Sequence, residues 1–411
     1  MEPRRISTEV CVVGGGPAGL MLGLLLVRAG VPVAVLEKHA DFLRDFRGDT
    51  VHPSTIRLLD RLGLAEKFLR LPHRKIRTLQ VTDSERTYRV AEFSGLSGRY
   101  PYVAFLPQWD FLDFLADEAS RYPHFTLLRS TEVTELTREN GTVTGVRASS
   151  PDGPVEVTAR LTVACDGRHS DVRRLLGLTP REFGAPMDVL WFRLPRRDAD
   201  GDGLLARIGT GKLMVVIDRG DYWQVAYVIP KGGYDQVVAA GLPAFRESVA
   251  ELFGALADRV DQITDWDQVR MLTVRINRLR RWHAPGVLLI GDAAHAMSPM
   301  GGVGINLAIQ DAVAAARLLA APLRTHRLTD KDLSRVRRRR WLPTAGTQFV
   351  QRIAQSGLIA GVLGSNVPAK APLPMRIADR VRPIRTLAAR LVGIGIRPEY
   401  DAPPPAPVRS R

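Results

Sequence analysis

Three short stretches of the sequence place glycines and carboxylates where a chain can hold a phosphorylated ligand. They are residues 14–19 (GGGPAG), Asp166-Gly167, and Gly291-Asp292 with the glycines at 301, 302 and 304. Glycines permit tight turns and close approach of a ligand to the backbone. A helix start carries unpaired N–H groups that attract anions, and a neighbouring carboxylate accepts hydrogen bonds from sugar hydroxyls. This combination is typical of dinucleotide binding.

The N-terminal stretch has the order of a nucleotide-binding βαβ unit. A strand is expected at Glu9 to Val13, followed by the glycine turn and an apolar helix from Leu20 to Ala29. A second strand, Val31 to Leu36, ends at Glu37, eighteen residues after Gly19. In such units the glycines line a pyrophosphate and the acid binds a ribose 2′-hydroxyl. Because an acid repels a 2′-phosphate, this site fits FAD or NAD rather than NADP.

The stretch at 287–311 predicts the other end of the same ligand. An apolar strand ends at Gly291-Asp292, and a glycine cluster then opens an apolar helix running toward Leu319. The partial positive charge of a helix start stabilises a negative group held against it. Asp292 is placed to accept hydrogen bonds from a ribityl chain, and the helix start near Gly302 suits a flat ring that becomes anionic. The expected ligand is a flavin.

The middle stretch, residues 161–177, is less specific. A buried strand, Leu161 to Cys165, is expected to end at Asp166-Gly167, with a helix from Ser170 or Asp171. The arginines at 168, 173 and 174 are candidates to hold pyrophosphate or a second nucleotide. An isolated Asp-Gly is more often an ordinary turn, but its position between the other two motifs favours a binding role.

Together the three motifs resemble the signatures of the single-component FAD-dependent aromatic monooxygenases, the relatives of para-hydroxybenzoate hydroxylase and ubiquinone-pathway hydroxylases. The resemblance covers about residues 8–345. It implies an α/β fold with a Rossmann-like FAD-binding domain, an inserted β-sheet substrate domain and C-terminal helices. The FAD-binding residues that it implies are Gly14, Gly16, Pro17, Ala18 and Gly19 at the pyrophosphate, Glu37 and Lys38 at the adenosine ribose, Arg47 and Gln108 toward the phosphate and ribityl chain, Val133 at the adenine, Asp166 and Asp292 at the pyrophosphate or ribityl chain, Pro299 beside the ring, and Gly301, Gly302, Gly304, Ile305 and Asn306 at the pyrimidine end.

Alternation of sequence patterns suggests how the chain is divided. The expected units are a discontinuous FAD-binding domain (1–73, 103–178 and 276–345), a β-rich substrate domain forming one sheet over the flavin (74–102 and 179–275), a C-terminal helical segment (346–397) and a disordered tail (398–411).

Catalysis is expected to rest on the flavin, because the eight histidines are scattered without metal-ligand spacing and no Ser-His-Asp order accompanies a nucleophile elbow. No metal is expected, and His295 is expected only to brace its loop. The hypothesis is that NAD(P)H reduces FAD, O2 forms a C4a-hydroperoxide, and one oxygen passes to an aromatic, polyketide-like or quinone-like small molecule. The candidate pocket walls are Trp191, Phe192, Met214, Val216, Trp223, Val225 and Tyr227, with Met297 and Pro299 on the flavin side.

Three other functions share parts of this pattern. A flavin-dependent halogenase is disfavoured, because its Trp-x-Trp-x-Ile-Pro signature is replaced by AYVIP at 226–230. An FAD-dependent reductase of the geranylgeranyl type and a non-catalytic FAD sensor remain open. The single nucleotide fingerprint excludes a separate NADPH domain of the disulfide-reductase kind.

Composition limits the partners and the location. The net charge of +15 is mostly arginine, with seven lysines, but aromatic residues are 7% and no nucleic-acid-binding signature is present. Nucleic acid is therefore not expected as a partner. Cys11 and Cys165 lie in expected strands and are interpreted as core residues of a protein in the reducing cytoplasm. No apolar stretch is long enough to span a bilayer.

The C-terminal region contains an apolar stripe with two explanations. Its members are Ile377, Val381, Ile384, Leu387 and Leu391, with arginines elsewhere on the helical wheel. The favoured explanation is a helix packed on the FAD-binding domain with solvated arginines. The alternative is weak peripheral membrane contact, useful for a lipophilic substrate.

Overall fold

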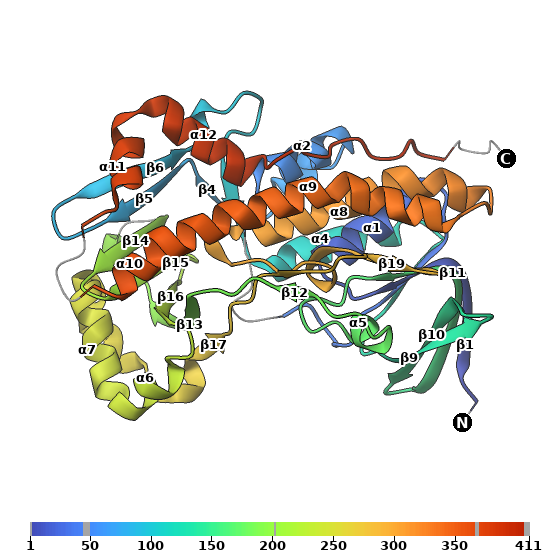
Figure 1. The fold of residues 1–411 in the computed structure, drawn as a ribbon, viewed down its shortest axis with the longest axis horizontal. Coiled ribbons are helices and arrows are strands. Elements are labelled where there is room, and N and C mark those ends of the chain that lie inside the picture. The colour runs from blue at the N-terminus through green and yellow to red at the C-terminus, as the bar shows by residue number, and fades with distance from the viewer. Residues whose placement is uncertain (1, 44–49, 201–202, 366–369, 407–411) are drawn as a thin grey trace.

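Two large β-sheets organise the chain, with long helices packed between and around them (Figure 1). The structure is a computed structural model, and it describes residues 2–43, 50–200, 203–365 and 370–406. The first sheet has the strand order β19-β20-β11-β1-β2-β8, with β9 and β10 continuing from β11. Its strands are β1 (Arg4–Val13), β2 (Val33–Leu36), β8 (Phe125–Leu128), β9 (Glu132–Glu139), β10 (Thr142–Ser150), β11 (Gly153–Ala164), β19 (His283–Ala284) and β20 (Val287–Leu289).

The first sheet is buried on both faces, as its apolar strands require. On β1, Val10 and Val12 belong to the core shared with helices α1 (Pro17–Arg28), α4 (Gln108–Ser120) and α8 (Val303–Arg324). Cys11 and Val13 point to the opposite face, toward the β9–β10 layer. Both cysteines are free, and burial raises the pKa of the Cys11 thiol to about 12.

The second sheet joins the two β-rich blocks of the sequence, as expected. Its order is β17-β13-β16-β15-β14-β5-β6, and the parallel pair β5–β14 connects the blocks. The strands are β5 (Thr78–Thr82), β6 (Thr87–Glu92), β13 (Met187–Pro195), β14 (Leu204–Gly209), β15 (Lys212–Asp218), β16 (Tyr222–Pro230) and β17 (Arg270–Leu272). Where one domain ends and the next begins stays a prediction.

Two small sheets, further helices and short helical turns complete the fold. Two small sheets pair β3 (Thr50–Val51), β7 (Val103–Phe105) and β4 (Arg74–Ile76), and β12 (Arg181–Glu182) with β18 (Asn277–Arg278). The other helices are α2 (Pro53–Arg61), α3 (Ala65–Phe68), α5 (Asp171–Leu175), α6 (Tyr234–Ala240), α7 (Leu242–Leu252), α9 (Asp330–Ala354), α10 (Ala360–Leu363), α11 (Leu373–Arg380) and α12 (Arg382–Gly393). The remaining turns are η1 (Phe93–Gly95), η2 (Asp198–Asp200), η3 (Gly254–Gln262), η4 (Trp266–Gln268), η5 (Gly291–Ala293), η6 (Met300–Gly302) and the π-helix η7 (Gln355–Ile359).

Helices α8 and α9 run side by side across the molecule (Figure 1). The segment Met300–Arg324 is long and apolar enough to cross a bilayer by length and composition, but 72% of its most apolar window is buried inside the protein. It is therefore a core helix. Helix α9 continues through position 345, so the expected start of a separate helical segment at 346 falls inside one helix.

The C-terminal helices correct the favoured expectation for the apolar stripe. Helices α11 and α12 cover β6 of the second sheet (Figure 1), and the end of α12 also contacts His52 and Ser54 of the FAD-binding part. Their buried positions are Ala378, Arg385, Ala389 and Gly393, whereas the stripe itself faces outward. Small side chains and one paired arginine, not the stripe, form the contact with the sheet.

Residues 394–406, which follow α12, are anchored, although composition predicts a disordered tail at 398–411; residues 407–411 of that predicted tail lie outside the described residues. Glu399 is 3% exposed and forms ion pairs with Arg317 (3.1 Å), Arg339 and Arg340 (3.9 Å). The N–H of Ala406 donates to the carbonyl of Arg28 at 3.0 Å. Contacts with three arginines outweigh the local preference of a proline-rich segment for disorder.

We expect Glu399→Ala to lower the free energy of unfolding by roughly 3 kcal/mol, because it leaves buried arginine charge without its partner. Urea unfolding measures the change. The matched control is Asp401→Ala, which removes an exposed partner of Arg61 and should change stability by less than about 0.5 kcal/mol. Equal effects of the two substitutions would contradict the anchoring role.

Candidate cofactor-binding site

The predicted motifs meet at one edge of the first sheet. Strands β20, β11, β1 and β2 are adjacent and parallel, so their carboxyl ends share an edge. Gly14, Glu37, Asp166 and Asp292 follow the ends of these four strands. A Cβ added to Gly14 would lie 2.9 Å from the Cα of Asp166, which shows how closely two of the turns approach.

The glycine turn before α1 leaves space for a ligand. Gly14 has φ of +105°, and a Cβ on Gly19 would lie 2.0 Å from the carbonyl oxygen of Gly14. In contrast, a Cβ on Gly16 would meet no atom within 4 Å. Helix α1 begins at Pro17 with neither a side-chain cap nor an acidic residue in its first turn, with Ala18 next to it. Its free N–H groups can therefore bind an anion.

Glu37 is fixed by the turn that it is predicted to serve. Its Oε2 accepts the Gly15 N–H at 2.9 Å and its Oε1 accepts the His39 N–H at 3.1 Å. The carboxylate is 9% exposed. Since each carboxylate oxygen has two lone pairs, it retains capacity for ribose hydroxyls.

The other residues predicted to bind the adenosine or ribityl part of FAD differ in burial and in the element that carries them. Lys38 is half exposed and lies 4.0 Å from Glu132. Gln108 is the buried first residue of α4, and Val133 pairs with Ala148 between β9 and β10. The predicted residue Arg47 lies outside the described residues.

Asp166 holds an unsatisfied buried oxygen. Its Oδ2 accepts the Val172 N–H at 3.0 Å, whereas its Oδ1 is buried without a hydrogen-bond partner. Burial raises the pKa of this carboxyl above its usual range. A buried polar atom of this kind is normally satisfied by a neighbour, and a ligand hydroxyl at the sheet edge would supply one.

The arginines after Asp166 mostly serve the protein itself. Arg173 donates to the carbonyl of Arg168 at 2.6 Å and to that of Ala293 at 3.0 Å, which ties the second motif to the third. Burial lowers the pKa of its guanidinium. Arg174 pairs with Asp171 at 2.8 Å. Of the three candidates only Arg168, which lies 3.8 Å from Asp292, reaches the carboxylate at the edge.

The third motif forms the start of α8. Gly301 and Gly302 have φ of +76° and +62°, and a Cβ on Gly302 would lie 2.3 Å from the Thr50 Oγ1. Helix α8 then begins at Val303 without an acidic residue in its first turn or a side-chain cap. Its N–H groups therefore remain available to a negatively charged ring edge.

The other residues predicted near this helix start differ in their surroundings. Pro299 precedes the turn η6, and a Cβ on Gly304 would meet no atom within 4 Å. Ile305 packs against the main core. The Asn306 Oδ1 accepts hydrogen bonds from the hydroxyls of Ser54 (2.6 Å) and Thr55 (2.8 Å), so its carbonyl is already used by α2. A ligand would therefore meet its amide nitrogen or backbone.

A buried ionic network supports the third motif. Asp311 Oδ2 accepts the Gly291 N–H at 3.1 Å and lies 2.5 Å from the His295 Nε2, while Oδ1 accepts from Arg340 Nε at 2.8 Å. Each of the three ionisable side chains is at most 1% exposed. Burial alone would raise the pKa of Asp311, but His295 and Arg340 hold it below its usual range. His295 thus braces its loop through Asp311.

Asp311 and Arg340 are not among the residues predicted from sequence, although both carry a signal there. Asp311 is the one acid in the apolar helical stretch 303–316, and a charge in such a position needs a partner. Arg340 belongs to the arginine run 337–340, a pattern typical of a solvated surface, yet it is fully buried. The sequence does not show that these two residues, 29 positions apart, meet.

Three glutamines of the α9 region were also missed. Gln348, Gln351 and Gln355 are each at most 4% exposed and lie on one helix face, at spacings of three and four residues. Gln348 Nε2 donates to the carbonyl of Ala296 at 3.0 Å, and Gln351 Nε2 to those of Ser298 (3.1 Å) and Met300 (3.2 Å). Together with Gln355, which bonds the Ser298 hydroxyl, they hold the loop that precedes the α8 start.

The predicted pocket wall combined two opposite faces of the second sheet. Trp191 lies on the face that also contacts Met300, just before the α8 glycines. Met214, Trp223 and Tyr227 lie on the other face, packed against helices α6 and α7. The further candidates on that face are Phe192, Val216 and Val225. Because successive strand residues point to opposite sides, choosing every large apolar residue necessarily selected both faces.

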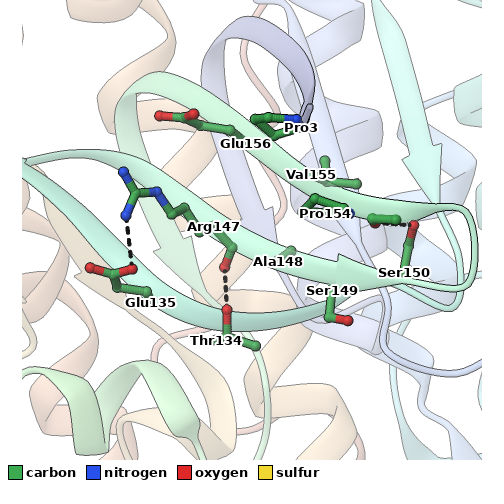
Figure 2. Close-up of a pocket in the computed structure, with 11 residues that line it drawn as sticks. Pro3, Thr134, Glu135, Arg147, Ala148, Ser149, Ser150, Pro154, Val155 and Glu156 are labelled. Atoms are coloured by element: carbon green, nitrogen blue, oxygen red, sulfur yellow. Dashed lines mark hydrogen bonds and ion pairs between the residues drawn. The ribbon is translucent and has the colours of Figure 1, made fainter. Parts of the chain in front are cut away.

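A surface hollow of about 410 Å³ lies elsewhere (Figure 2). Figure 2 shows side chains of β9, β10 and β11 around it, with Arg147 paired to Glu135 at 3.1 Å. Arg4, at the first end of β1, pairs with the lining residue Val155. Since β1 has 10 residues, about 30 Å of strand separate this end from the glycine turn. The hollow does not belong to the motif edge.

Comparison with known proteins agrees with this geometry. The family model described as "FAD binding domain" matches residues 7–347. The chain belongs to this family of FAD-dependent monooxygenases. It is 34% identical to the 6-methylpretetramide 4-monooxygenase of Streptomyces rimosus over 93% of this chain and 92% of that protein.

Two solved structures share the fold of the monooxygenase. The p-nitrophenol 4-monooxygenase PnpA of Pseudomonas putida superposes with a TM-score of 0.75 at 22% identity, covering 95% of this chain and 98% of that chain. The anhydrotetracycline hydroxylase OxyS of Streptomyces rimosus superposes with a TM-score of 0.72 at 25% identity, covering 94% of this chain and 76% of that chain. The monooxygenase is therefore a flavoprotein oxidoreductase whose cofactor is FAD.

The described residues of the monooxygenase fit FAD. The open space at Gly16 and the free N–H groups of α1 suit its pyrophosphate. The unsatisfied Asp166 Oδ1 suits a hydroxyl, and the uncapped start of α8 suits the ring. We propose that these groups hold the cofactor.

A buried histidine connects this site to the C-terminal helix. His52 is fully buried, with Nδ1 2.8 Å from the Val392 carbonyl and Nε2 3.3 Å from the Thr50 Oγ1, which donates to the Gly302 carbonyl. Burial is the main cause that lowers the pKa of His52 to about 4. The neutral ring therefore holds α12 against the α8 start.

We expect Gly16→Ala to weaken FAD binding at least about tenfold, because the new methyl group fills the space left for the pyrophosphate. The apoprotein should keep its melting temperature, since no atom lies within 4 Å of that methyl. Fluorescence titration gives Kd for FAD, and Gly254→Ala, equally unhindered, is the control. Unchanged FAD affinity in Gly16→Ala would reject the assignment.

Because His52 is buried as the neutral ring, we expect the free energy of unfolding to fall in acid. The unfolded chain takes up its proton near pH 6.5 and the folded chain only near pH 4. The His52 contribution is therefore complete above pH 6.5 and is lost as pH falls toward 4, on the order of 3 kcal/mol. Urea unfolding across this range should show a smaller decline for His52→Gln than for the wild type. The exposed His124 is the control, and His124→Gln should leave the decline intact; an identical decline in His52→Gln would refute the assignment.

Proposed function

We propose that this monooxygenase hydroxylates an aromatic or polyketide-like small molecule, with NAD(P)H as reductant and O2 as oxygen donor. The observation that carries the proposal is the position of Met300. It directly precedes the glycines that open α8, and it packs against one apolar face of the second sheet. The predicted flavin ring thus lies between a helix start and an apolar wall.

The apolar wall sets the class of substrate. Its members are hydrophobic, and several are only partly buried, so they can contact a ligand. Apolar side chains favour a planar, weakly polar molecule over a sugar or an acid. The wall consists of Ala185, Met187, Val189, Trp191, Leu213, Val215, Ala226, Val228, Leu272, Val274 and Met300, with Leu363 of α10 packed against it. The similarity to the 6-methylpretetramide 4-monooxygenase supports a polycyclic phenol.

The protein contributes positioning, electrostatics and exclusion of water. Bound FAD supplies electron storage and activation of O2. The N–H groups at the start of α8 stabilise negative charge on the ring edge. Gln351 donates to the carbonyls of Ser298 and Met300, so both buried acceptors are satisfied by α9. The wall keeps water from the reacting atoms.

Two further partners belong to the proposal. The sequence has one dinucleotide fingerprint, which Glu37 and the glycine turn assign to FAD, so we infer that NAD(P)H binds transiently at the flavin. We also infer that the enzyme works in the cytoplasm with weak peripheral membrane contact through its C-terminal region, where apolar side chains face outward.

The proposal is tested by turnover of planar phenols of one to four rings under ¹⁸O2. We expect substrate-stimulated NAD(P)H oxidation and a product that gains one labelled oxygen. Reduction of a double bond without O2 consumption would instead establish a reductase, and halide incorporation a halogenase. FAD binding without consumption of any reductant would establish a sensor.

Two variants distinguish the faces of the second sheet in the same assay. Trp191→Leu should lower kcat/KM about tenfold or more and increase the release of hydrogen peroxide, because it opens the wall beside Met300. Tyr227→Phe should cost about 1 kcal/mol of stability through its lost bond to Ser248 (2.7 Å) while turnover persists. The reverse pattern would place the substrate on the α7 side.

A further inference from the structure

Helices α11 and α12 expose their largest apolar side chains. We name this surface the C-terminal apolar face; its members and exposed fractions are Leu373 (65%), Ile377 (41%), Val381 (39%), Ile384 (39%), Leu387 (56%) and Leu391 (37%). Both helices lie over β6 and contact each other (Figure 1).

This orientation is the inverse of an ordinary surface helix, which buries its apolar stripe. The side facing β6 carries the small residues Ala378 and Ala389. It also carries Arg385, whose guanidinium pairs with Glu92 at 3.1 Å and is 9% exposed. The buried Arg385 fixes the rotation of α12, because turning the stripe inward would bring this charge out of its ion pair. The outward stripe is therefore a stable property of the fold.

The same surface is positively charged. Arg376, Arg380, Arg382 and Arg390 are exposed, and they form no ion pair with the residues that the structure describes. The one acid of the two helices, Asp379, is turned inward toward Arg86 (3.5 Å) and Arg89 (3.9 Å). The face thus combines apolar groups with exposed positive charge.

The exposed apolar side chains and the positive charge together indicate which partner binds this face. In a two-fold dimer the same face meets itself, which would bring the arginines of both copies together without an acid between them, and like charges oppose such contact. The exposed area of the six apolar side chains together equals that of about three fully exposed residues. A stable protein–protein interface buries roughly 800 Å² on each partner, which is more than these side chains offer. An anionic lipid surface satisfies both the charge and the apolar groups.

The face is also next to the cofactor site. At the end of α12, the Val392 carbonyl contacts His52 and the Gly393 carbonyl accepts from the Ser54 hydroxyl at 3.1 Å. A Cβ on Gly301 would lie 3.8 Å from the Val392 side chain. A surface that receives lipid at α12 is therefore one helix away from the start of α8, and apolar substrates dissolve in lipid.

We propose that the C-terminal apolar face docks the enzyme on anionic membrane surfaces, with its leucines and isoleucines among the acyl chains and its arginines at the phosphates. This rests on the peripheral contact proposed above and assigns to it a surface and a lipid charge. The hydroxylation chemistry does not depend on it.

The test is flotation of the full-chain FAD enzyme with phospholipid vesicles. We expect binding to vesicles rich in phosphatidylglycerol and little binding to pure phosphatidylcholine. Binding should weaken between 0.1 M and 1 M salt, since the screening length falls from about 10 Å to about 3 Å. Absence of binding to the anionic vesicles at low salt would overturn the proposal.

Variants locate the contact. Leu373→Ser with Leu387→Ser should lower vesicle affinity about fivefold for each leucine, and Arg380→Gln with Arg382→Gln about fivefold for each arginine. Met271→Ser, at a 45% exposed apolar residue of β17, is the matched control and should leave affinity unchanged. All variants should retain FAD absorbance and turnover of a soluble phenol, which separates this test from that of the proposed function.

Two outcomes would contradict the assignment in these variants. Unchanged vesicle binding in both double variants would place the contact elsewhere. A wild-type dimer in sedimentation that becomes monomeric in Leu373→Ser with Leu387→Ser would make a second copy the occupant.

Discussion

The cofactor site depends on one buried carboxylate, Asp311. It receives hydrogen bonds from the Gly291 N–H and from Arg340, and it contacts His295, so it joins the end of β20, helix α8 and helix α9. Removing any partner would leave buried charge unpaired, which is far costlier than losing a surface ion pair. This network fixes the turn that carries Asp292 relative to the start of α8, and through Glu399 it also holds the tail in place.

Much of the first sheet and its edge can be predicted from sequence, because the signals are local. The strand, glycine turn, helix and acid at Gly14 to Glu37 lie within one stretch, and each element limits the next. The same is true of the strand, Gly291-Asp292 and the α8 start. Parallel strands must end at one edge, so predicting the strands also predicts that Gly14, Asp166 and Asp292 meet there.

The buried ion pair, the proposed substrate wall and the outward apolar stripe depend on contacts between residues far apart in sequence, which a local sequence pattern does not reveal. Asp311 and Arg340 become a pair only when α8 and α9 pack together. The proposed substrate wall depends on the side of the sheet toward which each strand residue points, and composition does not reveal that side. Trp191 was therefore predicted together with Met214, although they lie on opposite faces. The apolar stripe of α12 was expected to pack inward, because nothing near Arg385 in sequence reveals that Glu92 binds it.

FAD is proposed to be held jointly by the turns after β1, β11 and β20 at one sheet edge and by the start of α8. Amide hydrogen exchange of the apoenzyme with and without FAD tests this proposal most directly. We predict slowed exchange in four segments at once, residues 14–19, 166–172, 291–295 and 301–306, with no change in the hairpin around Arg147. Protection confined to one segment, or appearing at the hairpin instead, would contradict the account.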